Sequence, residues 1–207
     1  MAKERLKSPR ARLFVALDLP VRVRDALAAW QERECADPAL RPVPAEALHV
    51  TLCFLGYHPE KAIDRIACVV AEPRPRPVPM RLVAEPVPIP KGRPRLYAVG
   101  AESAVAIELQ RELSDAFEAE RLYEPEKRDF WPHVTAARVR AERSRGGSAG
   151  RRRGRPRRVE RLPGRLPDGL REPFSGVRVA LYRSILKPQG AEYVSLAGVD
   201  LPSAKGD

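Results

Sequence analysis

The apolar residues of the chain fall into short runs and helical stripes that alternate along most of its length. RLFVALDL, residues 12–19, is a nearly continuous apolar run, which predicts a buried strand. Val23, Leu27 and Trp30 follow at spacings of four and three and predict an amphipathic helix. After a proline-rich stretch expected to be loop, LHVTLCFL predicts a second strand that ends at Gly56.

The same order of elements returns in the second half of the chain. RLYAVGAE, a helical stripe and HVTAARV follow one another there, as RLFVALDL, a helical stripe and LHVTLCFL do earlier. Arg12 and His49 are 37 positions apart in the first copy, and Arg95 and His133 are 38 apart in the second. We infer one strand–helix–strand unit that is used twice, in two similar lobes.

The rest of the pattern adds a few elements to this duplicated core. We expect a helix from about Glu60 to Ala71, a strand broken by prolines in MRLVAEPVPI that is either an edge strand or a bulged one, and two closing strands in FSGVRVALYRSIL and AEYVSLAGVDL. The expected organisation is a basic tail over residues 1–11, one bilobal α+β domain over residues 12–200, and a short tail over residues 201–207.

The strong positive charge comes mainly from one segment. The formal net charge is +11 and the isoelectric point is about 10.1, values that suggest an acidic partner, most commonly nucleic acid. Between Arg140 and Arg158 there are nine arginines and one glutamate, which account for +8 of this charge. Glycine and serine are interspersed among them, so we expect a disordered insertion over about residues 140–164.

Other features of the whole chain narrow the class of protein to which it can belong. Apolar residues make up 43% of the chain, which is ordinary for a globular protein, and no run of eighteen apolar residues predicts a membrane span. The three cysteines have neither metal-ligand spacing nor an even number for a disulfide frame. There is no asparagine and hence no glycosylation sequon. These features together predict a cytoplasmic protein with reduced thiols.

The residues that could carry chemistry are scarce and repeated. The chain has three histidines and only two threonines, and Thr51 and Thr135 each lie two residues after a histidine, His49 and His133. Random placement would put both threonines there only about once in ten thousand sequences. The third histidine, His58, has no such neighbour and is expected in a solvated loop. The repeated H-V-T is therefore the candidate site.

Side chains alternate across a strand, so the histidine and threonine of each H-V-T point to one face and the valine to the other. If the two lobes pair about a pseudo-twofold axis, both strands line one cleft. Two imidazoles can supply an acid and a base near neutral pH, and two hydroxyls can each donate a hydrogen bond to a phosphate oxygen. No carboxylate or Cys/His cluster with metal-ligand spacing accompanies them. These residues predict phosphoryl chemistry without a metal or cofactor.

With these motifs the chain resembles the two-histidine phosphoesterase superfamily, in its RNA 2',3'-cyclic phosphodiesterase branch, which is also called LigT-like or RNA 2'-5' ligase-like. The matching stretches lie between Arg12 and Leu196 and are RLFVALDLP, LHVTLCFLG, RPRLYAVG, FWPHVTAARV and LYRSILKPQGAEYVSL. The resemblance implies antiparallel sheets around a central cleft. It also implies hydrolysis of RNA 2',3'-cyclic phosphodiester ends to 2'-phosphomonoesters, with weak reverse 2'-5' RNA ligation.

The resemblance also implies roles for single residues. His49 corresponds to the proton donor for the departing 3'-oxygen, and His133 to the proton acceptor that activates water. Thr51 and Thr135 would bind the phosphate, and Arg138 would lie near the phosphate or the base. The odd offset of Arg138 from His133 places it on the opposite face of an ideal strand unless a bulge intervenes. A solvated arginine at the strand end is the alternative.

Phe54 and the arginine-rich insertion each allow more than one interpretation. Phe54, five residues after His49, could stack on a nucleobase as the resemblance implies, or pack in the core. Ala136 and Ala137 replace the Leu-Ala that the family usually has after the second H-V-T, which is a small packing change. The arginine-rich insertion is the larger departure. We hypothesise that it recruits longer RNA, with a tolerated loop insertion as the alternative.

Two other functions stay open from the sequence alone. One is a two-histidine phosphoesterase that acts on another cyclic or 2'-5' nucleotide. The other is a non-catalytic module that binds RNA or nucleotide phosphate, although binding alone does not need a matched acid and base. A cleft formed within one chain needs no partner subunit, so we expect a monomer that binds RNA ends.

Overall fold

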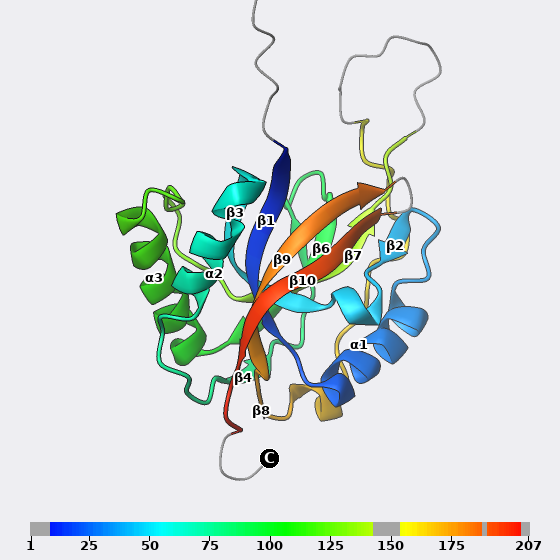
Figure 1. Cartoon of the computed structure of the whole chain (residues 1–207). Coiled ribbons are helices and arrows are strands. Elements are labelled where there is room, and N and C mark those ends of the chain that lie inside the picture. Colours follow the sequence, from blue (N-terminus) through cyan, green and yellow to red (C-terminus); the bar gives the residue numbers. More distant parts are fainter. Residues whose placement is uncertain (1–8, 143–153, 188–189, 204–207) are drawn as a thin grey trace, which may run out of the picture.

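The computed structural model describes residues 9–142, 154–187 and 190–203. Its centre consists of two strand–helix–strand units, as the sequence predicts (Figure 1). The first unit is β1 (Arg10–Asp18), α1 (Val21–Glu34) and β3 (His49–Pro59). The second unit is β6 (Leu96–Glu102), α3 (Ala104–Ala119) and β7 (His133–Val139).

The remaining elements extend and cover these units. They are β2 (Leu40–Pro42), α2 (Ile63–Val70), β4 (Pro79–Leu82), β5 (Val87–Ile89), β8 (Phe174–Ser175), β9 (Arg178–Lys187), β10 (Gly190–Asp200), and 3-10 turns at Ala45–Ala47, Glu60–Ala62 and Asp168–Arg171. The antiparallel pairing of β9 with β10 agrees with the sequence prediction, and the expected strand broken by prolines is present as two pieces, β4 and β5, which each pair with β6.

The strands form one continuous antiparallel path in the order β10-β9-β1-β3-β7-β6-β4-β8. The two units therefore meet in the middle of the sheet, where β3 and β7 pair through Val50 and Val134. Each unit keeps its own antiparallel neighbours, because β1 pairs with β3 and β6 pairs with β7. The α+β class and the duplicated architecture expected from the sequence are confirmed.

The core lies between the sheet and the helices. The predicted stripe of α1, Val23, Leu27 and Trp30, is buried, and so is the equivalent apolar stripe of α3. Figure 1 shows α2 and α3 together at the left of the sheet and α1 at its lower right. Among the described residues, no helix has both the length and the apolar character needed to cross a bilayer.

Two local expectations are wrong near the first H-V-T. β3 does not end at Gly56 but continues to Pro59, because residues 56–59 pair with β1; Gly56 itself adopts a φ of +78°. The third histidine, His58, consequently lies on β3 and contacts the Leu55 carbonyl through Nε2 at 3.0 Å, so it is not a solvated loop residue. The preceding prolyl loop contains the short strand β2, which pairs with β7.

The arginine-rich insertion is ordered in part. Asp37, which is almost fully buried, accepts hydrogen bonds from the backbone N–H groups of Glu160 and Arg161, both at 2.8 Å. Ala141 and Pro156 form an isolated β-bridge that continues the β7 strand. The expectation of disorder over 140–164 is therefore wrong for residues 140–142 and 154–164, which are hydrogen-bonded to one another and to the domain, and residues 143–153 lie outside the described residues.

Candidate active site

The pairing of β3 with β7 brings the two H-V-T segments together. Val50 and Val134 pair and point into the core, where both are fully buried. The histidine and threonine of each segment lie on the opposite face and are half-buried. Because the strands are antiparallel, this register sets His49 opposite Thr135 on the neighbouring strand, and His133 opposite the first threonine.

Each strand then has an extra residue at the same place after its H-V-T. Leu52 of β3 has no partner in the ladder with β1, and Ala136 of β7 has no partner in the ladder with β6. An extra residue shifts the alternation of side chains by one. This shift brings Phe54 and Arg138, each five residues after its histidine, to the cleft face. The bulge that Arg138 requires is therefore present, and Phe54 is exposed, so it is not a core residue.

Each imidazole is fixed by a backbone carbonyl two residues before it. His49 Nδ1 donates to the Ala47 carbonyl and His133 Nδ1 donates to the Trp131 carbonyl, both at 2.8 Å. A carbonyl only accepts, so each Nδ1 holds the proton and each Nε2 has the free lone pair in the neutral ring. His49 Nε2 is 3.1 Å from the hydroxyl of Thr51.

The ring of His49 packs in a cluster of aromatic side chains. It stacks on Phe14, with ring centroids 5.1 Å apart, and meets the edge of Tyr193 at 5.4 Å. Phe14 in turn stacks on Tyr182 at 5.3 Å. These three aromatics come from β1, β9 and β10, so the closing strands of the chain complete the surroundings of the first histidine.

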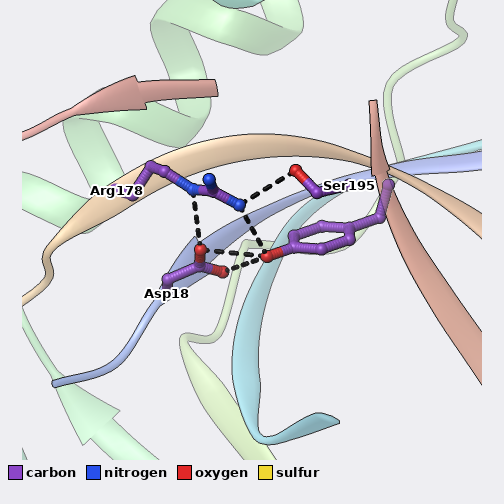
Figure 2. Close-up of polar contacts among 4 residues, drawn as sticks. Asp18, Arg178 and Ser195 are labelled. Carbon is purple, nitrogen blue, oxygen red and sulfur yellow. Dashed lines mark hydrogen bonds and ion pairs between the residues drawn. The ribbon is translucent and has the colours of Figure 1, made fainter. Parts of the chain in front are cut away.

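A polar cluster anchors the far end of this stack. The hydroxyl of Tyr182 donates to the carboxylate of Asp18, with distances of 2.8 and 2.9 Å to the two oxygens. Arg178 donates to Asp18 at 3.0 Å and to Ser195 at 2.9 Å, as Figure 2 shows. Asp18 is also the cross-strand partner of His49 in the β1–β3 ladder. The cluster therefore holds Tyr182, and through the stack it positions His49.

The two histidines differ in their electrostatic surroundings. Burial lowers the pKa of His49 to about 4, and the positive charge of Arg138 and the neighbouring His133 act in the same direction. Burial also lowers the pKa of His133, with a further contribution from Arg128. Both rings are therefore neutral at neutral pH in the free protein, with unprotonated Nε2 atoms.

A cavity of about 460 Å³ opens on the His133 side of the site. Thr51, Phe54, Trp131 and His133 are among its lining residues. Trp131 stacks on His133 at 4.7 Å, and the guanidinium of Arg12 lies 4.6 Å from the centre of the Phe54 ring. His49 does not line this cavity, because the aromatic cluster of β1, β9 and β10 packs against its ring.

Several supporting groups have little signal in the sequence. The backbone carbonyls of Ala47 and Trp131 bind the two histidines, and any residue type at these positions would offer the same carbonyl. Asp18 is the one acidic residue in an otherwise apolar run, but the sequence does not show that it lies opposite His49 in the sheet. Among the described residues, no group of three or more His, Cys, Asp or Glu side chains could hold a metal ion.

Known proteins resemble this chain in sequence and in fold. The family model described as the 2'-5' RNA ligase superfamily matches residues 19–149. An RNA 2',3'-cyclic phosphodiesterase from Thermus thermophilus is 33% identical over an alignment 208 positions long, gaps included, which covers 94% of this chain and 92% of the relative.

Two solved structures share the fold. A crystal structure of a protein from Thermus thermophilus superposes with a TM-score of 0.72 at 30% identity, covering 92% of this chain and 97% of that one. Escherichia coli LigT, crystallised with NADP+, superposes with a TM-score of 0.69 at 21% identity, covering 94% and 99%. At that identity the second match bears on the fold alone.

Proposed function

This chain belongs to the 2'-5' RNA ligase superfamily, and we propose that it hydrolyses 2',3'-cyclic phosphodiester ends of RNA to 2'-phosphomonoesters. The observation that carries the proposal is the pairing of two identical H-V-T segments at the middle of the sheet, with one imidazole and one hydroxyl from each on the same face. The cleft is built within one chain, so the proposed active unit is a monomer.

In the proposed reaction the two histidines act on opposite sides of the phosphorus. His133 takes a proton from water through Nε2, and the water oxygen bonds to phosphorus. The bond from phosphorus to the 3'-oxygen breaks, and His49 gives its Nε2 proton to that oxygen. The 2'-oxygen keeps the phosphate. If the 5'-hydroxyl of another RNA attacked the phosphorus in place of water, the same proton transfers would leave the two RNAs joined by a 2'-5' linkage.

The phosphate would be held by hydroxyls and positive charge. In this proposal Thr51 and Thr135 each donate one hydrogen bond to one of the two non-bridging oxygens. Thr51 contacts His49 in the free protein and would turn from the ring to the phosphate on binding. Arg138 makes no side-chain hydrogen bond or ion pair among the described residues, so it is available to offset the charge of the pentacoordinate state.

The proton that His49 donates must arrive with the substrate. With a pKa of about 4 the ring is neutral in the free protein. A bound phosphodiester places a negative charge beside the ring, which favours the imidazolium and raises its pKa. His133, beside the open cavity, then acts as the base.

The test uses purified protein in EDTA and an oligonucleotide that ends in a 2',3'-cyclic phosphate. We expect a 2'-phosphate product, and we expect His49→Ala and His133→Ala each to lower kcat by about 10²–10⁴-fold, as removal of a general acid or base does. A 3'-phosphate product would contradict the proposed direction of cleavage. Binding without turnover would favour a binding module, and turnover of other cyclic or 2'-5' nucleotides alone would favour a different substrate.

A further inference from the structure

Two arginines lie side by side in the sheet at the edge of the candidate active site. β2 pairs with β7 in an antiparallel ladder in which Arg41 is the direct partner of Arg138. Direct partners in such a ladder point to the same face of the sheet, with their Cβ atoms about 4.5–5.5 Å apart. Arg138 faces the cleft because of the bulge at Ala136, so Arg41 faces the cleft as well.

The neighbours of Arg138 on the two edges of β7 show where this pair lies. On one edge its partner is Leu96 of β6, which lines the cavity beside His133. On the other edge its partner is Arg41, and β3, which carries His49, pairs with this same edge. The cleft face of β7 therefore has the cavity on one side and a second positive charge on the side of His49.

The side chain of Arg41 lies against the end of the β9–β10 hairpin. A Cβ atom on Gly190, the first residue of β10, would lie 3.5 Å from Nη1 and 3.7 Å from Cζ of Arg41. Figure 1 shows the same approach, with the end of β9 and the start of β10 beside β2. Arg41 is half-buried in this position, so its guanidinium lies between two strands rather than extending into bulk solvent.

Two positive charges that face each other in a sheet are unfavourable without an anion. Like charges directly opposite one another destabilise a pair of strands. An anion between them reverses this effect, because each guanidinium can form two parallel hydrogen bonds with phosphate oxygens. A cyclic phosphodiester is a single anion, so the pair of Arg41 and Arg138 suits a substrate that brings a second one.

The chemistry of ribose decides where the second phosphate of an RNA end lies. The linkage to the upstream nucleotide leaves through C5', which is bonded to C4', the neighbour of C3'. The upstream phosphate is therefore on the side of the 3'-oxygen of the terminal ribose. In the proposed reaction His49 protonates this 3'-oxygen, so the upstream phosphate lies on the side of His49. Arg41 is on this side of β7.

We propose that Arg41 binds the phosphate that joins the terminal nucleotide to the rest of the RNA, while Arg138 stays beside the cyclic phosphate. The proposal rests on the proposed function, because it requires the cyclic phosphate to lie between His49 and His133. A cyclic mononucleotide with a 5'-hydroxyl lacks the group that Arg41 binds. The site then distinguishes an RNA end from such a mononucleotide by charge, whatever base the RNA end carries.

The test removes the charge of this one phosphate. Two short oligonucleotides of the same sequence end in a 2',3'-cyclic phosphate, and the linkage before the terminal nucleotide is a phosphodiester in one and an uncharged methylphosphonate in the other. The upstream nucleotides are 2'-O-methylated in both, which keeps the methylphosphonate linkage from breaking. A third oligonucleotide has its methylphosphonate one linkage further upstream, as a control for position.

The readout is the ratio of kcat/KM for the phosphodiester to that for the methylphosphonate next to the terminal nucleotide. We expect about tenfold or more for the wild type, as for a hydrogen bond to a charged group, and a smaller ratio for the linkage further upstream. Arg41→Gln should bring the ratio close to one. Arg81→Gln should keep the wild-type ratio, because Arg81 is at an exposed position of β4, where its ladder partner is Glu102 of β6.

The possible failures of the two proposals differ. A folded Arg41→Gln protein with the wild-type ratio would overturn the proposal for Arg41, even if its kcat/KM fell equally on both substrates. A wild type that hydrolyses the two substrates equally well would overturn it too. A wild type without turnover on any of these oligonucleotides would instead contradict the proposed function.

A second variant covers the case in which Arg41→Gln does not fold. Arg41→Lys keeps the positive charge and loses only the paired donors of the guanidinium, so its ratio should fall but stay above one at low salt. Because salt screens exposed charges, the ratio that remains should shrink further as the salt concentration is raised. A ratio of one for folded Arg41→Lys at low salt would overturn the proposal.

Discussion

At the scale of single residues, the two histidines share a backbone anchor but have different surroundings. Both donate Nδ1–H to a carbonyl two residues earlier, so both present Nε2 to the cleft. His49 packs among aromatics and lies near Arg138, whereas His133 adjoins an open cavity. One duplicated motif can thus supply an acid and a base, because the residues around each ring set its proton affinity.

We predict that substrate binding takes up a proton. A cyclic-ended oligonucleotide should raise the pKa of His49 from about 4, so that binding takes up protons at pH values between this pKa and the higher pKa of the complex. The measurement is calorimetric titration of His133→Ala, whose expected slow turnover leaves binding to be measured, in buffers of different ionisation enthalpy. Uptake should grow as the pH falls below neutral and should shrink again near pH 4, where the free ring already carries the proton.

The control for this proton uptake is His49→Gln in the same His133→Ala background. It keeps a polar side chain at the position but has no group that titrates there. Equal proton uptake with and without the imidazole of His49 would show that another group is protonated, and no uptake in either protein would contradict the role of His49 as donor.

At the scale of elements, the bulges decide which side chains reach the cleft. The sequence pattern predicted both H-V-T strands and the buried faces of α1 and α3, because these follow from regular periods. Strict alternation placed Arg138 on the opposite face unless a bulge intervened, and the sequence left the place of Phe54 open, since the extra residues Leu52 and Ala136 have no distinctive side chain. Whether a strand contains such a bulge depends on how it pairs with its neighbour. The spacing of apolar residues along a single segment carries no information about that pairing.

Gly56 lies in the irregular part of β3, where its backbone adopts a positive φ. Its φ of +78° disfavours any side chain, although a Cβ there would meet no other atom within 4 Å. We predict that Gly56→Ala lowers the free energy of unfolding by about 1 kcal/mol through the backbone alone. Gly92 also has open space around it and lacks a positive φ, so Gly92→Ala should stay within about 0.5 kcal/mol of the wild type. Urea unfolding curves measure both values, and equal effects would contradict the prediction.

At the scale of the whole molecule, the sequence was least informative about long-range polar contacts. Nothing near Asp37 in the sequence indicates that its carboxylate binds backbone groups more than 120 positions later. These bonds, together with the bridge between Ala141 and Pro156, place the ends of the arginine-rich segment beside the strand that carries His133. Composition alone could not show that residues 154–164 of the arginine-rich segment pack against the domain.

We predict that the arginines within residues 143–153 increase the rate on long RNA. Five arginines and no acidic residue lie in that stretch. Replacing all five with glutamine should lower kcat/KM on long RNA by about tenfold at low salt and reduce its salt dependence, with no change on a short oligonucleotide. Replacement of the stretch by Asn-Gly should have the same effect. Unchanged activity on long RNA at low salt would leave a tolerated insertion as the explanation.

The pairing of β1 with β9 has a consequence for the order of events during protein synthesis. Asp18 and Arg178 are neighbours in the sheet but 160 positions apart in the chain. A ribosome has therefore made both histidines well before Tyr182 and Tyr193 exist to enclose the ring of His49. Contacts this distant form late, so we expect a chain that ends before β9 to lack hydrolytic activity, which an assay of that truncated chain would check. The nascent enzyme would then be unable to act on RNA until its last strands have left the ribosome.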